Sequence, residues 1–211
     1  AKMTLGGVTS GTDVGSYSAT FTPKGNYQWA DGSTAARTVP WSIGKSTVAP
    51  PQQSGNLTYS GSAQTPVWTG YDATKLTMGG TTSGTNAGTY TATFTPTGNY
   101  AWADGSTGAK SVTWTISKAV GSLTLSKSSL TLNAATLSTT FTVTRLGDGA
   151  INVTSSATNV ATVTLSGTTV TVTAKGKGSA TITVSVGAGT NHSAPANKTC
   201  SVTVTLPTTT L

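Results

Sequence analysis

Two short segments each place a Tyr, a Trp and an Asp within five residues, a set that can hold a sugar ring. The stretch GNYQWADGST, residues 25–34, reappears as GNYAWADGST at residues 98–107. An exposed aromatic ring beside a carboxylate suits a carbohydrate, but Tyr and Trp are also the largest apolar side chains that a small domain can bury. The segments are therefore either a binding platform used twice or a structural element, and the candidate ligand-binding residues are Tyr27, Trp29, Tyr100 and Trp102.

The other reactive side chains are too few for catalysis. The chain has no Glu and a single His, His192, in the segment GTNHSAP, which we interpret as a solvated loop residue. Paired-carboxylate hydrolysis needs two acids within roughly 5 to 10 Å, whereas Asp31 and Asp104 occupy equivalent positions in two copies of one segment. No second His or nearby Cys completes a metal set or a nucleophile–base pair. We predict no catalytic residue, no metal site and no cofactor.

The composition is that of an all-β protein. Charged residues make up 8% of the 211 residues, and Thr and Ser dominate the polar positions. β-Branched Thr and Val suit the pleated surface of a strand, whereas helices draw on Glu, Lys, Ala and Leu for their solvent faces. No helix of two turns is expected anywhere in the chain.

The formal net charge of +7 could attract a polyanion, but the twelve Lys and Arg residues are scattered from Lys2 to Lys198. A weakly basic surface is favoured over a dedicated nucleic-acid site. No window approaches the ~18 apolar residues of a membrane span, so no membrane insertion is expected. The lone Cys200 continues a strand pattern and is interpreted as a small buried hydrophobe.

The sequence contains a tandem repeat with an offset of 73 residues, from Trp29 to Trp102. With this offset, residues 1–45 align without a gap on residues 74–118, for example VPWSIGK on VTWTISK. A fixed period of this fidelity marks an array of modules. We therefore divide the chain into a first repeat at residues 1–45, a second module at 46–118 and a third module at 119–211 that ends in a short tail, TLPTTTL. Aromatic residues almost vanish in the third module.

The second copy has an additional front end, APPQQSGNLTYSGSAQTPVWTGYDATK, at residues 49–75. The first copy is interpreted as an incomplete module without these opening strands. Either they are lost, or another chain supplies them by adding a strand to the open edge of the first module.

Strand positions follow from strict alternation. TYTATFTP puts Tyr90, Ala92 and Phe94 on one face and threonines on the other, and SVTWTIS places Val112, Trp114 and Ile116 likewise. The third module shows about seven short strands at intervals of roughly 8 to 12 residues, the pattern of an immunoglobulin-like sandwich. Both copies predict a β-hairpin, in which the segment NY-x-W is followed by the Asp-Gly turn and the next strand. This arrangement favours a structural role for the Tyr and Trp side chains. It also assigns Asp104 to the turn.

Residues 119–206 resemble bacterial immunoglobulin-like repeats of group 2, through LTLSKSSLTL, NVATV and KGKGSATITV. The two 73-residue copies resemble a second bacterial immunoglobulin-like repeat type, through LTYSGSAQTPVWTGYD, NAGTYTATFTPTGNY and VTWTISKA. The resemblance implies tandem immunoglobulin-like β-sandwich modules of bacterial surface proteins or phage virions. It implies an extracellular location and no catalytic residues.

The leading functional hypothesis is a non-catalytic structural and interaction module, a rod-like spacer or display domain of a phage virion or bacterial surface protein, with weak cell-surface adhesion as an added role. Its expected partners are neighbouring immunoglobulin-like modules, other virion or surface proteins, and host-surface glycans. The alternative is a carbohydrate-binding adhesin module that uses the repeated Tyr-x-Trp-Ala-Asp segment, with avidity from two weak copies.

Overall fold

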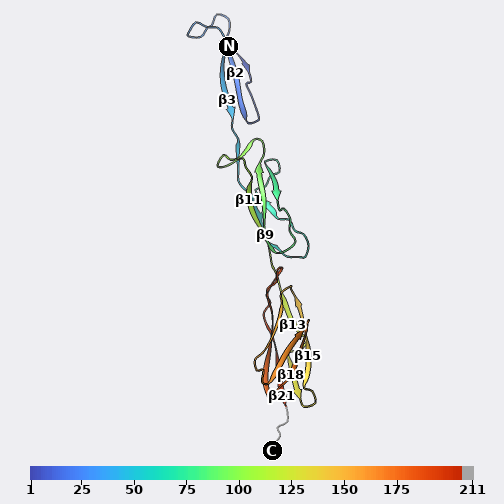
Figure 1. The fold of residues 1–211 in the computed structure, drawn as a ribbon. Helices are drawn as coiled ribbons and strands as arrows, with labels where there is room; N and C mark the ends of the chain where they lie inside the picture. The colour runs from blue at the N-terminus through green and yellow to red at the C-terminus, as the bar shows by residue number, and fades with distance from the viewer. Residues whose placement is uncertain (206–211) are drawn as a thin grey trace, which may run out of the picture. The chain divides into compact units, whose positions relative to one another are not determined.

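The fold was taken from a computed structural model that describes residues 1–205 of the 211. Within that range the chain forms strands, turns and loops and no helix, so the prediction of an all-β protein is confirmed (Figure 1). The tail predicted at residues 205–211 lies outside the described residues except for Thr205.

The backbone divides into two compact units. Unit 1 comprises residues 1–55, 66–82 and 90–114, and unit 2 comprises residues 56–65, 83–89 and 115–211. The division runs through the second module that the sequence predicts.

The first repeat is a three-stranded antiparallel sheet in the order β1-β2-β3, formed by β1 (Met3–Gly7), β2 (Gly15–Pro23) and β3 (Arg37–Ile43). In Figure 1 the strands β2 and β3 run side by side, and their register pairs Tyr17 with Trp41. Alternation places Tyr17, Ala19 and Phe21 on one face of β2, as the period of two requires.

The second module contains eight strands in three sheets. β4 pairs with β10 in parallel, β5 pairs with β7 antiparallel, and the remaining four form a sheet in the order β6-β11-β9-β8. The strands are β4 (Ser46–Val48), β5 (Gln52–Ser54), β6 (Leu57–Thr58), β7 (Val67–Thr69), β8 (Leu76–Gly80), β9 (Gly88–Pro96), β10 (Tyr100–Trp102) and β11 (Lys110–Ser117). The largest side chains buried in this module are Trp102, Trp114, Phe94 and Leu76.

The predicted hairpin between β10 and the following strand is wrong. β10 takes β4 as its partner, and the neighbours of β11 in its sheet are β6 and β9. The backbone N–H of Trp102 donates to the carbonyl of Ser106 at 2.9 Å, which closes a tight turn directly after β10.

The third module is a sandwich of two four-stranded sheets, ordered β13-β15-β18-β17 and β14-β21-β19-β16 (Figure 1). Inward-facing residues of both sheets, among them Phe141, Leu132 and Ile182, form one hydrophobic core. The strands are β12 (Ala119–Val120), β13 (Ser122–Leu125), β14 (Ser129–Asn133), β15 (Ser138–Leu146), β16 (Ile151–Ser155), β17 (Ala161–Ser166), β18 (Thr169–Ala174), β19 (Gly178–Val186), β20 (His192–Ser193) and β21 (Lys198–Thr205).

The sequence predicted about seven of these strands and missed β14 and the two short strands β12 and β20. The segment between Leu125 and Ser129 carries the chain from one sheet to the other, so that β13 pairs with β15 and β14 runs parallel to β21. Because β13 and β14 both contain the pattern Leu-Thr-Leu, alternation alone does not reveal that the chain changes sheet between them.

Candidate interaction sites

The four candidate ligand-binding residues lie in different environments although their local sequences match. Trp102 is fully buried and Tyr100 half-buried, whereas Trp29 is half-buried and Tyr27 is 50% exposed. In the first repeat Lys2 lies over the Tyr27 ring, with its ammonium 5.5 Å from the ring centroid. The rings of the first copy are thus more accessible than those of the second, and ligand binding by the four residues stays a prediction.

The two Asp-Gly turns are built alike. The Asp104 carboxylate accepts hydrogen bonds from the backbone N–H of Ser106 at 2.9 Å and from its hydroxyl at 2.6 Å. Gly105 adopts a φ of 81°, a left-handed conformation that suits glycine. Asp31 makes the same pair of bonds with Ser33. The prediction that Asp104 serves the turn is confirmed.

Each turn carboxylate also forms an ion pair with a basic side chain. Lys110 donates to Asp104 at 2.8 Å and lies over the Trp102 ring, while Arg37 pairs with Asp31 and stacks on Trp29 at 4.7 Å. The Lys110 ammonium, followed by the bonds from Ser106, holds the pKa of Asp104 well below its ordinary value. The bonds from Ser33 and the Arg37 charge lower the pKa of Asp31. Both carboxylates are therefore kept ionised and occupied by neighbours.

Asp72 is engaged in the same manner in a different turn. It accepts bonds from the backbone and the hydroxyl of Thr74 and pairs with Lys75 at 3.0 Å. These contacts, the Thr74 hydroxyl first, lower the pKa of Asp72 to about 2. A general acid needs the opposite shift, a pKa raised toward the working pH.

Unit 1 contains a set of contacts that the sequence did not predict, a junction between the first repeat and the loop before β10. The side-chain oxygen of Asn99 accepts the backbone N–H of Val14 at 2.9 Å, and its NH₂ group donates to the Asp13 carboxylate at 2.8 Å. Lys45 donates to the carbonyl of Gly98 at 2.6 Å. Immediately after Lys45 the chain forms β4, which runs parallel to β10.

The same junction recurs in unit 2. The side-chain oxygen of Asn191 accepts the N–H of Ala87 at 2.8 Å, and its NH₂ group donates to Asn86 at 3.1 Å. Lys118 donates to the carbonyl of Gly189 at 2.6 Å, and β12 then runs parallel to β20. Asn86, Ala87 and Lys118 stand 73 residues after Asp13, Val14 and Lys45, so the repeat offset itself could have indicated the junction.

His192 belongs to the second junction, so its interpretation as a solvated loop residue is wrong. It lies in β20 with a side chain only 15% exposed. Its Nδ1 is 3.3 Å from an Asp148 oxygen, and its ring meets Tyr59 edge-on at 5.3 Å. The Asp148 carboxylate also accepts the backbone N–H of Asn191, the main reason that its pKa falls to about 2.

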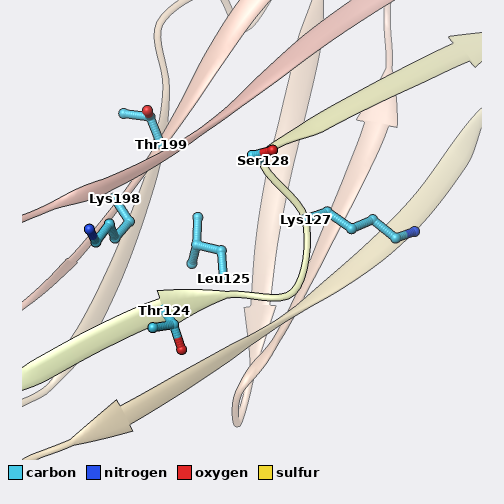
Figure 2. A pocket seen from close by; sticks show the side chains of 6 residues that line it. All are labelled: Thr124, Leu125, Lys127, Ser128, Lys198 and Thr199. Atoms are coloured by element: carbon cyan, nitrogen blue, oxygen red, sulfur yellow. The ribbon is translucent and has the colours of Figure 1, made fainter.

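The third module has a hollow of about 250 Å³ where the chain passes from β13 to β14. Figure 2 shows Leu125 on the same side of the connecting turn as Lys198 and Thr199, with the Lys127 side chain pointing away from it. The lining residues are Thr124, Leu125, Lys127, Ser128, Lys198 and Thr199. The hollow follows from the change of sheet and brings no carboxylate or imidazole to the two lysines.

Cys200 is fully buried in β21, so its interpretation as a small buried hydrophobe is confirmed. Burial raises the pKa of its thiol. Among residues 1–205 no three His, Cys, Asp or Glu side chains gather in a set that could hold a metal ion. No helix in that part of the chain is long and apolar enough to cross a membrane.

No protein-family model matches the chain, and no curated protein matches it. Among solved structures, the chain is similar to domains 4 and 5 of the S-layer protein SbsC, with 19% identity over 75% of this chain and 99% of that one and a TM-score of 0.38. It is also similar to SGBP-B of the mixed-linkage glucan utilization locus of Bacteroides ovatus, solved with a mixed-linkage heptasaccharide. There the identity is 13% over 92% of this chain and 54% of that one, with a TM-score of 0.18. At these values neither similarity carries an inference about function.

Proposed function

We propose that the chain is a non-catalytic structural module, a rod-like spacer or display segment of a phage virion or a bacterial surface protein. The observation that supports this function is the junction made twice, once in each unit. In both, one Asn side chain binds two consecutive residues, and a Lys caps a carbonyl of the same loop. An array that must hold its modules at a fixed spacing needs such a directional contact, because hydrogen bonds specify orientation where apolar contact does not.

The electrostatics of the carboxylates support a structural role as well. Asp31, Asp72, Asp104 and Asp148 each accept backbone or hydroxyl hydrogen bonds, and their pKa values lie below the ordinary value. A perturbed pKa that favours the ionised form in a closed turn stabilises that turn, whereas acid catalysis calls for a raised value in a cleft.

The test of the spacer function is a distance measurement across each junction. Spin labels placed on the two sides of the Asn99 junction should give a single narrow distance distribution, which the double variant Asn99→Ala, Lys45→Ala should broaden. Asn26→Ala, at the position equivalent to Asn99 in the first repeat, is the matched control and should leave the distribution unchanged. A broad distribution in the unaltered chain would contradict the spacer function.

The surface location has a separate test. Antibodies raised against residues 1–205 should label intact virions or cells of the source without permeabilisation. Labelling that requires lysis would contradict an extracellular display role.

A further inference from the structure

The first repeat presents an apolar sheet face whose counterpart in the second module is covered. Met3 and Leu5 of β1 are 46% and 56% exposed, and Val39 of β3 is 49% exposed. Met3 corresponds to Leu76, which is only 1% exposed, and the half-buried Phe21 corresponds to the fully buried Phe94. A hollow of about 310 Å³ over this face is lined by Leu5, Thr9, Ala19, Phe21, Val39 and Trp41.

The cover of the second module comes from the segment that precedes β8. Trp68 of β7 meets the Phe94 ring edge-on, with centroids 4.9 Å apart, and Tyr71 approaches the same ring at 5.6 Å. β5 pairs with β7 to hold this layer, and β4 occupies the edge of β10. Residues 46–71 thus supply both the apolar lid and the additional edge strand.

The receiving surface of the first repeat already has the arrangement of the covered one. Tyr17 stacks on Trp41 at 4.6 Å with planes 23° apart, and Tyr90 stacks on Trp114 at 4.5 Å and 22°. The Trp41 Nε1–H donates to the carbonyl of Val8 at 2.9 Å, as Trp114 does to Thr81 at 2.7 Å. A surface organised in advance leaves only the incoming segment to be ordered, which favours binding.

The edge and the loop beside this face also match. Trp29 makes the turn bonds of Trp102, with its indole N–H donating to Ala35 as Trp102 donates to Gly108, both at 2.7 Å. Asn26 precedes this edge as Asn99 precedes β10, and Gly25 has a positive φ as Gly98 does. Asn26 can therefore receive the end of another repeat as Asn99 receives Asp13 and Val14.

We propose that the open face and edge of the first repeat bind an extended, tryptophan-bearing segment with the pattern of residues 45–73, supplied by another copy of the repeat. The Trp and Tyr of the incoming segment cover Phe21, and its first strand pairs with residues 27–29. A protein segment fits this surface better than a glycan, because the face is lined by aliphatic and aromatic side chains and Asp31 is already bound to Arg37 and Ser33.

The test joins a copy of residues 45–73 to residue 1, because residue 1 aligns with residue 74 and the added segment then enters in the register of the second module. Amide hydrogen exchange of residues 3–43, whose sequence occurs once in this extended chain, should slow at least tenfold relative to the parent chain. The matched control carries Trp68→Ala in the added copy alone and should lose most of that protection.

The same pairing should occur between separate molecules. A synthetic peptide of residues 45–75 should bind the unmodified chain with one-to-one stoichiometry, and its Trp68→Ala version should bind at least tenfold more weakly. Equal exchange in the parent and extended chains would overturn the proposal, as would equal protection by the two versions of the added segment. Glycan binding at Tyr27 and Trp29 that persists undiminished in the extended chain would also overturn it and assign the surface to a carbohydrate.

Discussion

The first repeat and the second module share a sequence and a set of internal contacts but differ in burial. Their Tyr–Trp stacks, indole hydrogen bonds and Asp-Gly turns agree closely. Yet Trp102 and Phe94 are fully buried, whereas Trp29 and Phe21 are half-buried. The local contacts therefore form without the cover, and the cover supplies the burial. Burial of a large side chain contributes roughly 1.5 to 3 kcal/mol, so most of the difference in stability between the copies should arise from residues 46–71.

The largest effect is expected for the buried indole of the second module. Trp102→Ala should lower the free energy of unfolding by about 3 to 5 kcal/mol, because it leaves a large cavity in a closed core. The matched variant Trp29→Ala should cost less than half as much, since its ring is already in contact with solvent. Urea denaturation of both variants measures the difference. Equal losses would show that the cover adds nothing to the environment of Trp102.

Removing the lid should make the second module resemble the first. Trp68→Ala should destabilise the chain by about 2 kcal/mol, because Trp68 is only half-buried but covers Phe94. Exchange of the β9 amides should rise toward the rate of the β2 amides. Val67→Ala, at the exposed neighbour of Trp68, is the control and should have little effect. Unchanged β9 exchange in Trp68→Ala would refute the lid role.

A smaller loss is expected at the junction. Asn99→Ala removes two hydrogen bonds and should cost about 1 to 2 kcal/mol. Asn26→Ala, its counterpart in the first repeat, should change the free energy of unfolding by less than about 0.5 kcal/mol, as for a surface position. Thermal unfolding followed by circular dichroism compares the two. A loss at Asn26 as large as that at Asn99 would place an unrecognised contact in the first repeat.

The smallest effects concern the turn carboxylates, whose titration should distinguish the copies. Asp31 and Asp104 both have pKa values below the ordinary 3.8, so their contribution to stability is complete above about pH 4 and is lost as the pH falls through the folded value. NMR titration of the Ser33 and Ser106 amides reports each midpoint. Lys110→Ala should raise the Asp104 midpoint strongly, because the lysine is the largest cause of that shift.

Arg37→Ala should raise the Asp31 midpoint less, since the bonds from Ser33 outweigh the arginine there. An equal rise in both variants would show that the two turns depend on their cations to the same extent.

Alternation and the repeat offset were sufficient to predict β2, β3, β9 and β11, and composition was sufficient to predict the absence of helix in the described range. They could not predict that β10 pairs with β4, since that contact joins segments about 54 residues apart with no shared pattern. The sequence also supplied no sign that His192 would be held by Asp148 and Tyr59, because its own loop is polar and rich in turn residues.

The sequence by itself determined the strand faces, the Asp-Gly turns and the tandem organisation, because each depends on residues close together in the chain. Only the tertiary structure decided which Trp of two nearly identical segments is buried, since burial depends on segments that are distant in the chain. The same holds for Asn99 and Asn191, whose side chains have no strong local preference and acquire their roles from the backbone N–H groups that the fold places opposite them.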